Sequence, residues 1–400
     1  MKKGKWSPLS SDVLNEQEYD NSGIREKNTE IAEQRKHIIN NVFIDFGVEA
    51  SIKSYTVGSS VTRYNIEYNS DISSRTITNL ISDIQIRLGG VTVRFDAFSP
   101  GETTVGLEVD NLESETVSFK SFYDKLPAVR EHPLAIPLGQ RINGDLFWVD
   151  LNKTPHVLIV GTTGSGKSVL ENTIITTLMM RNSPKDLRFV LIDPKMVELS
   201  RFIDAPHLML PVVRRAEHIK GVFVTLLNEM EERYETFINQ RCCSIDEYNE
   251  IAKEKGLDKY PYIVVCVDEY ADVVDYDKTI ASDVLTLAKR AKAAGIHLVL
   301  LTQRPSTNFL TGAFKANMLT RVVLMTSSYV DSMTVLGEGG AEKLRGRGDM
   351  LVQSPLVSRI GTIRLQGCFI NRKEIKSVVN YLNENLAKNY QTNNGDREKQ

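Results

Sequence analysis

The stretch of sequence that decides the fold reads Gly161-Thr162-Thr163-Gly164-Ser165-Gly166-Lys167-Ser168, directly behind the apolar run Val157 to Val160. This is a complete phosphate-binding loop placed between an expected strand and an expected helix. Its glycines let the backbone turn tightly enough to present a ring of N–H donors at close range. We expect Gly161 to Val169 to bind a nucleoside triphosphate, because Lys167 can reach the β- and γ-phosphates and Ser168 can hold Mg²⁺.

A second apolar run, Ile263 to Val267, ends in two adjacent carboxylates, Asp268 and Glu269. Its length and β-branched residues predict a buried parallel strand. At the carboxyl end of such a strand, Asp268 can bind Mg²⁺ through water and Glu269 can take a proton from the attacking water. A third run, Leu298 to Leu301, leads to Gln303, whose side chain can sense the γ-phosphate. Together these features predict an ATPase that uses ATP and Mg²⁺.

Two further apolar runs, Phe189 to Ile192 and Arg321 to Met325, complete a set of short segments that alternate with helical-looking sequence. Strands alternating with helices indicate a mostly parallel sheet covered on both faces. The predicted fold class is therefore α/β, a RecA-like P-loop core that binds its nucleotide at the carboxyl ends of the strands. None of the runs is long enough to cross a bilayer, so we expect no membrane anchor and no signal peptide in this sequence.

The composition is typical of an intracellular enzyme with more than one packed domain, since the 400 residues are 41% hydrophobic. A net charge of −2 does not by itself indicate a nucleic-acid binder. A motor that encloses nucleic acid in a ring, however, needs basic residues only on the inner surface of the ring. The cysteines have no metal-ligand spacing and suit a reducing cytoplasm, which is the predicted location; they are Cys242, Cys243, Cys266 and Cys368.

The chain divides into four predicted parts. Residues 1–35 are polar and mixed in charge, which predicts a flexible leader, and residues 387–400 form a polar tail that we expect to fray. Residues 36–138 predict a small α+β domain, and residues 139–386 the motor domain. The small domain has one expected helix, Thr76 to Leu88, and four expected strands: Ser51 to Tyr55, Thr62 to Tyr68, Val91 to Phe95, and Thr104 to Val109.

Several separated motifs together resemble the FtsK/SpoIIIE family of double-stranded DNA translocases, in the family's order. They are Pro155 to Ser168, Ile192 to Ser200, the strand ending in Asp268-Glu269, Ala293 to His297, Gln303 to Ser306, Lys315 to Asn317, Gly339 to Glu342, and Gly348 to Leu351. The resemblance covers roughly residues 38–386. It implies a homo-hexameric ring that threads double-stranded DNA through a central pore by hydrolysing ATP. It also implies that the small domain is similar to the family's α domain, which forms a second ring.

The resemblance assigns a γ-phosphate sensor to Gln303 and a cation supplied to the transition state by a neighbouring subunit. Where the family commonly reads Lys-Ala-Arg-Ala-Ala-Gly, this chain reads Arg-Ala-Lys-Ala-Ala-Gly from Arg290. The expected arginine finger is therefore Lys292. Because a lysine cannot make the forked contact of a guanidinium, either Lys292 works as a weaker finger or Arg290 replaces it.

The resemblance also places Arg304 and Lys315 on pore loops that touch the DNA backbone, a contact that is independent of sequence. Tyr329 and Met333 stand where the family often has basic residues, so we expect a weaker or redistributed grip. Two further arginines are candidates to compensate: Arg345 and Arg347.

Chromosome-segregating members carry membrane helices, a long linker and a carboxyl-terminal winged-helix domain, none of which we recognise in this sequence. We therefore expect a stand-alone motor of a plasmid, phage or integrative element. One alternative is a conjugative coupling or secretion ATPase, which would need a membrane or transfer-machinery partner. Another is an ATP-dependent DNA-binding switch that does not translocate. Glu269 argues against the switch, because a pure switch has little need of a catalytic base.

Overall fold

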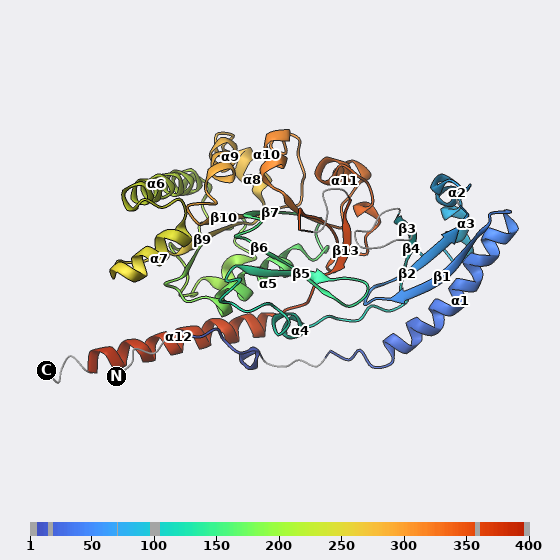
Figure 1. The fold of residues 1–400 in the computed structure, drawn as a ribbon, viewed down its shortest axis with the longest axis horizontal. Coiled ribbons are helices and arrows are strands. Elements are labelled where there is room, and N and C mark those ends of the chain that lie inside the picture. Colours follow the sequence, from blue (N-terminus) through green and yellow to red (C-terminus); the bar gives the residue numbers. More distant parts are fainter. Residues whose placement is uncertain (1–5, 15–18, 70, 97–104, 357–360, 396–400) are drawn as a thin grey trace.

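Two β-sheets organise the molecule (Figure 1). The computed structural model describes residues 6–14, 19–69, 71–96, 105–356 and 361–395. A four-stranded antiparallel sheet belongs to the small amino-terminal domain, and a nine-stranded mixed sheet forms the centre of the motor. The α/β class predicted from the sequence is confirmed by this arrangement. Within the described residues, no helix combines the length and apolar character that crossing a bilayer requires.

The small domain packs helices against one antiparallel sheet of strand order β1-β2-β4-β3. Its strands are β1 Ala50–Val57, β2 Val61–Tyr68, β3 Val93–Asp96 and β4 Val105–Asp110, and its helices are α1 Ile24–Asp45, α2 Ser74–Asn79 and α3 Ile81–Arg87. The single helix expected from Thr76 to Leu88 is thus broken in two at Leu80. The core of the domain includes Phe43, Tyr64 and Leu107, all fully buried.

The expectation of a flexible leader at residues 1–35 is wrong for its described part, because α1 begins at Ile24. The buried face of α1 carries Asn28 and Arg35, whose side chains donate to the backbone carbonyls of Glu113 and Asp110. Composition alone does not distinguish buried polar residues that are hydrogen-bonded in this way from polar residues exposed to solvent. Upstream, Leu9 is buried against the motor, and its N–H donates to the carbonyl oxygen of Met180 at 2.8 Å.

The motor sheet has the strand order β6-β5-β13-β12-β11-β7-β10-β9-β8. Its parallel part confirms the apolar runs that the sequence predicted as strands: β11 Thr320–Leu324, β7 His156–Val160, β10 Ile296–Thr302, β9 Tyr262–Val267 and β8 Leu187–Ile192. Thr302 pairs with Val160, so the carboxyl ends of β10 and β7 lie at one edge of the sheet. That edge is where the predicted nucleotide loop emerges.

Four antiparallel strands extend this sheet and were not anticipated: β5 Ala135–Gln140, β6 Leu146–Asp150, β12 Asp349–Gln353 and β13 Ile363–Gln366. The predicted boundary at residue 139 therefore falls inside a strand of the motor sheet. Pro137 lies in β5 beside a register shift against β6, where its missing N–H is tolerated. Because Pro137 and Gly139 interrupt the apolar pattern, the sequence of this segment does not predict a strand.

Helices cover both faces of the motor sheet (Figure 1). One face packs against α6 Ala216–Gln240, α8 Tyr270–Tyr276, α9 Ile280–Arg290, α10 Gly312–Asn317 and α11 Tyr329–Leu336. The other packs against α4 Phe119–Tyr123, α5 Lys167–Arg181, α7 Ile245–Lys255 and α12 Arg372–Gly395. Three single turns of 3-10 helix occur at Ser11–Val13, Leu199–Phe202 and Ala341–Lys343. Helical backbone continues to Gly395, so most of the predicted polar tail at 387–400 is helical.

A network of buried charges joins the two domains. The guanidinium of Arg364 on β13 lies 3.1 Å from Glu108 and 3.4 Å from Asp110, both on β4 of the small domain, and 2.7 Å from Asp349 on β12. Arg345 donates to the carbonyl oxygens of Ser60 and Asn111 in the small domain; these distances are 2.7 and 3.0 Å. The junction is therefore held by multiply hydrogen-bonded charges rather than by apolar packing alone.

Candidate nucleotide site

The predicted phosphate-binding loop connects β7 to α5. Gly164 and Gly166 have φ of 79° and 106°, a left-handed conformation that strains any other residue. A Cβ atom on Gly166 would lie 2.5 Å from the backbone nitrogen of Gly348. Within the described chain, the amides of Thr163, Gly164 and Gly166 make no backbone hydrogen bond, which leaves donors for an anion.

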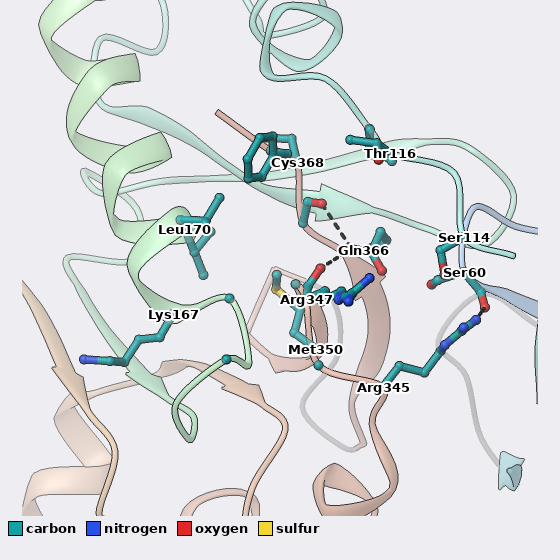
Figure 2. Close-up of a pocket in the computed structure, with 18 of the residues that line it drawn as sticks. Ser60, Ser114, Thr116, Lys167, Leu170, Arg345, Arg347, Met350, Gln366 and Cys368 are labelled. Atoms are coloured by element: carbon teal, nitrogen blue, oxygen red, sulfur yellow. Dashed lines mark hydrogen bonds between the residues drawn. The ribbon is translucent and has the colours of Figure 1, made fainter. Parts of the chain in front are cut away.

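A cavity of about 1170 Å³ opens over this loop. One wall is the segment Arg345–Gly348, whose N–H groups at Arg347 and Gly348 donate to the carbonyl oxygens of Gly164 and Ser165 at 3.2 and 2.7 Å. Another wall is the segment of residues 112–117, which leads out of the small domain. Figure 2 shows Ser114 and Thr116 across the cavity from Lys167. The cavity is therefore built between the two domains and has a phosphate-type loop at one end.

Lys167, which lines the cavity, forms a buried ion pair with Asp268, which does not line it. The side chains are 6% and 7% exposed, and the Lys167 ammonium donates to Asp268 Oδ1. Ser168 also lines the cavity. In the described residues no cluster of three or more His, Cys, Asp or Glu side chains could hold a metal ion by itself. One carboxylate and one hydroxyl nevertheless fit Mg²⁺, which usually takes its other oxygens from phosphates and water.

Glu269 directly follows Asp268 in a strained backbone conformation. Its φ of 63° is uncommon for a residue other than glycine and is seen at functional sites. The side chain is 1% exposed, and its Oε1 accepts from the Thr302 hydroxyl at 2.8 Å and from the Gln303 N–H at 3.0 Å. Its Oε2 lies 3.4 Å from the Lys195 ammonium. Strand ends β9 and β10 and the loop after β8 therefore meet at this carboxylate.

Gln303 lies between Glu269 and the phosphate-binding loop. Its side-chain oxygen accepts from the Thr163 hydroxyl at 3.2 Å, while its N–H bonds to Glu269. The structure thus brings the predicted loop, Asp268, Glu269 and Gln303 together at one edge of the sheet. This grouping is the arrangement that the strand-end argument from the sequence required.

Lys292 and Arg290 are not part of this grouping. Both precede β10, whereas Gln303 follows it, so they lie at the opposite edge of the sheet, roughly 20 Å away for a strand of this length. Arg290 is held by Glu231 at 2.7 Å and lies over the ring of Tyr234. Lys292 is exposed, and its side chain makes no hydrogen bond or ion pair in the described part of the chain.

The predicted DNA contacts differ in their surroundings. The Arg304 side chain is 66% exposed and pairs with Asp272, with Asp275 3.7 Å away. Lys315 is half-buried, and its ammonium donates to the carbonyl oxygen of Thr334 at 3.2 Å. Arg345 belongs to the domain junction instead of an open surface. Its suggested role in compensating for lost DNA contacts is therefore not supported.

Sequence reasoning missed three contributors to the site. Lys195 stood inside a recognised motif but had no assigned role, and nothing in its spacing indicated that it reaches Glu269. The other two are Asp272, which lies 3.1 Å from the Lys195 ammonium, and Glu171. Glu171 lies one turn after Lys167 on α5 and is fully buried, and neither of its oxygens accepts a hydrogen bond from a residue that the structure describes. Burial, followed by the charge of Asp268, raises the pKa of Glu171 well above its ordinary value.

A mostly parallel sheet covered by helices, with a phosphate-binding loop and two carboxylates at the strand ends, defines a RecA-like P-loop ATPase fold. The profile described as the FtsK/SpoIIIE family matches residues 121–307, and the profile described as the FtsK alpha domain matches residues 10–111. The chain belongs to the FtsK/SpoIIIE family, and its small domain is an FtsK alpha domain.

Relatives in this family are similar over nearly the whole chain. The DNA translocase FtsK of Clostridium tetani is 40% identical over 384 residues, which are 94% of this chain and 50% of the relative. The DNA translocase FtsK of Streptococcus pneumoniae is 37% identical over 91% of this chain and 48% of the relative. The chain therefore spans about half the length of these relatives.

Solved structures support the fold. The pCW3 conjugation coupling protein TcpA, in a monomer form with ATPγS, aligns with a TM-score of 0.58 and 20% identity over 87% of this chain and 99% of that chain. The cytoplasmic domain of the Thermomonospora curvata type VII secretion ATPase EccC also gives a TM-score of 0.58, with 22% identity over 66% of this chain and 34% of that chain. At these identities the likeness concerns the fold alone.

Proposed function

We propose that this chain is an ATP-hydrolysing motor that translocates double-stranded DNA. The observation that carries the proposal is the meeting of Lys167, Asp268, Glu269 and Gln303 at one edge of the sheet, in a chain of the FtsK/SpoIIIE family. A buried ammonium paired with the carboxylate of Asp268 suits a site that exchanges one anion for another. The similarity to proteins named DNA translocases supports duplex DNA as the substrate that is moved.

The loop from Gly161 to Val169 would hold the triphosphate of ATP through its free amides and Lys167. To contact a phosphate, the Lys167 ammonium leaves Asp268, which frees that carboxylate. Ser168 and Asp268 are the residues that would hold Mg²⁺, and Mg²⁺ would neutralise charge on the phosphate oxygens. The release of Asp268 and the arrival of phosphate at Lys167 therefore form one exchange of partners.

Glu269 is the group that would accept a proton from the attacking water. Gln303 would orient the water or the terminal phosphate, since its side chain reaches the loop at Thr163. Removing Lys167 removes phosphate charge, whereas converting Glu269 to glutamine removes only the base and retains the size of the side chain.

A ring of subunits is the second part of the proposal. Lys292 lies too far from its own nucleotide loop to act within one chain, so it would serve as the finger of a neighbouring subunit in a homo-hexamer. The pairing of Arg290 with Glu231 supports Lys292 over Arg290 in this role. The relevant compartment would be the cytoplasm, where free cysteines such as Cys243 stay reduced.

Arg304 and Lys315 would contact the phosphates of duplex DNA. Because such contacts release counterions, Arg304→Ala combined with Lys315→Ala should flatten the salt dependence of DNA binding by roughly one unit per lost contact. Unrelated duplexes should be affected alike. An unchanged slope would move the DNA contacts to other residues.

The proposed enzyme activity is tested by two variants measured side by side. Lys167→Ala should lose ATP binding. Glu269→Gln should bind ATP normally and hydrolyse it at least about 10²-fold more slowly with duplex DNA present. Binding is measured with a fluorescent ATP analogue and hydrolysis by phosphate release. A wild-type rate in Glu269→Gln would show that Glu269 is not the base.

A further inference from the structure

The carboxylate of Glu269 is fully engaged in this structure. Oε1 accepts hydrogen bonds from the Thr302 hydroxyl and the Gln303 N–H, and Oε2 lies 3.3 Å from the same N–H and 3.4 Å from the Lys195 ammonium. Only 1% of the side chain is exposed to solvent. A general base needs a free lone pair within hydrogen-bond reach of the proton that it takes. Some of these contacts must therefore loosen before Glu269 can act.

Lys195 is the contact that is best placed to loosen. Its side chain is 44% exposed, and its ammonium is shared between Glu269 and Asp272, the latter at 3.1 Å. Burial acts to lower the pKa of Lys195, but its hydrogen bond to Asp272 and the charge of Glu269 outweigh burial and raise it. Lys195 therefore stays a cation and can shift between two carboxylates without a proton transfer.

The other oxygen of Asp272 is bound by Arg304. Four charged groups thus alternate in sign from the exposed surface to the site: Arg304, Asp272, Lys195 and Glu269. The backbone supplies a second connection, since the N–H of Arg304 donates to the Thr302 hydroxyl at 3.2 Å, and that hydroxyl donates to Glu269. A displacement of Arg304 therefore changes the surroundings of Glu269 in two ways, through Asp272 and Lys195 and through the Thr302 hydroxyl.

We propose that this chain of charges is a relay that makes hydrolysis depend on DNA. A phosphate of the duplex draws the Arg304 guanidinium away from Asp272. Asp272, which has lost one cation, attracts Lys195 more strongly and draws its ammonium away from Glu269. The freed carboxylate then takes the proton of the attacking water. Lys195 and Arg304 keep their protons throughout. Lys195 and Asp272 are positioning residues, and the proposal rests on the proposed roles of Glu269 and Arg304.

The relay predicts opposite effects for its two middle members. Lys195→Met removes the cation that restrains Glu269, so the DNA-free ATPase rate should rise and the ratio of DNA-stimulated to DNA-free rate should fall toward about one. Asp272→Asn removes the carboxylate that draws Lys195 away, so the DNA-free rate should stay low and DNA should no longer raise it. Duplex DNA should still bind to Asp272→Asn, because Arg304 loses a competing partner.

The experiment measures kcat and KM for ATP with and without linear duplex, on the full chain, together with duplex affinity. The matched control is Lys220→Met, which breaks a comparable ion pair with Asp283 between α6 and α9, away from the site. It should show wild-type stimulation. Lys195→Arg, which keeps the charge, should retain DNA stimulation. Equal urea midpoints for all variants exclude a general loss of structure.

Two results would overturn the relay: normal DNA stimulation in Asp272→Asn, or a reduced DNA-free rate with intact stimulation in Lys195→Met. These results differ from a failure of the proposed function. That failure appears as unimpaired hydrolysis in Glu269→Gln, or as a wild-type ATPase that duplex DNA does not stimulate.

Discussion

Two networks of charged side chains in this molecule differ in how far the protein encloses them. At the domain junction, Arg364 is 3% exposed and its partners Glu108 and Asp349 are 3% and 1% exposed. At the nucleotide site, Lys195 is 44% exposed and Arg304 66%, although both connect to the buried Glu269. The charges of the junction are enclosed between groups of both domains, which suits them to holding the domains together. The open charges can exchange partners, which suits them to a reaction cycle.

The largest expected effect concerns two neighbouring exposed cations, Arg290, which pairs with Glu231, and Lys292, which has no ion-pair partner among the described residues. Lys292→Ala should lower kcat on the order of 10³-fold with little change in ATP affinity, because a finger stabilises charge that develops only in the transition state. Arg290→Ala should have a much smaller effect, since Arg290 is held by Glu231. Steady-state kinetics with duplex DNA measures both. A large loss of kcat in Arg290→Ala, with no change of kcat in Lys292→Ala, would assign the finger to Arg290 instead of Lys292.

A further variant at this position sharpens the comparison. Lys292→Arg should speed hydrolysis, because a planar guanidinium can contact two oxygens at once. If the variant is slower than wild type, the site is shaped around lysine and the expectation taken from the family does not hold.

The stability of the two networks should differ next most. Arg364→Met leaves buried Asp349 without its closest cation and should lower the free energy of unfolding by about 3–5 kcal/mol. Lys195→Met should lower it by less, because the Lys195 side chain is 44% exposed and Glu269 keeps its hydrogen bonds from Thr302 and Gln303. Urea unfolding at pH 7 gives both values. Equal losses of unfolding free energy in the two variants would show that the burial of the charges does not determine how much each network contributes to stability.

Three buried histidines that belong to neither network should make the stability of the fold depend on pH. His156, His207 and His297 are buried, and burial lowers their pKa values to about 3, 4 and 4. When the pH is lowered from 7 to 5, these histidines take up protons in the unfolded chain and not in the folded one. The free energy of unfolding therefore decreases by roughly 2 kcal/mol for each histidine. Glu171, whose raised pKa acts in the opposite direction, offsets part of this loss.

The net expectation is a free energy of unfolding that is lower at pH 5 than at pH 7, by less than the roughly 6 kcal/mol that the three histidines contribute together. Urea unfolding at intermediate pH values should show the fall beginning near pH 6.5. Stability that stays level or rises toward pH 5 would mean that these histidines become protonated in the folded protein.

The smallest expected effect is a gain. Glu171→Leu should raise the free energy of unfolding by about 1–2 kcal/mol, because an apolar side chain needs no hydrogen-bond partners in this fully buried position. Glu171→Gln keeps the size and the unsatisfied polar atoms, and should remain close to wild type. A loss of stability in Glu171→Leu would reveal a partner for the carboxyl group.

The parallel strands and the centre of the site were predictable because each is a local pattern. The run Ile263 to Val267 is apolar, β-branched and followed at once by its functional carboxylates. The contact of Lys195 with Glu269 joins residues that are 74 positions apart, and no local pattern encodes it. Helix α1 was missed for a related reason, since its buried polar residues are satisfied by distant backbone carbonyls.

The central claim is that ATP hydrolysis at this site moves duplex DNA. The most direct measurement is displacement of a third strand from a linear duplex that carries a triplex, with the wild-type chain, ATP and Mg²⁺. We expect ATP-dependent displacement, with a lag that lengthens as the triplex is placed farther from the loading end, and no displacement by Glu269→Gln. Absence of displacement by a wild-type chain whose ATPase responds normally to duplex DNA would contradict translocation and indicate a DNA-binding switch.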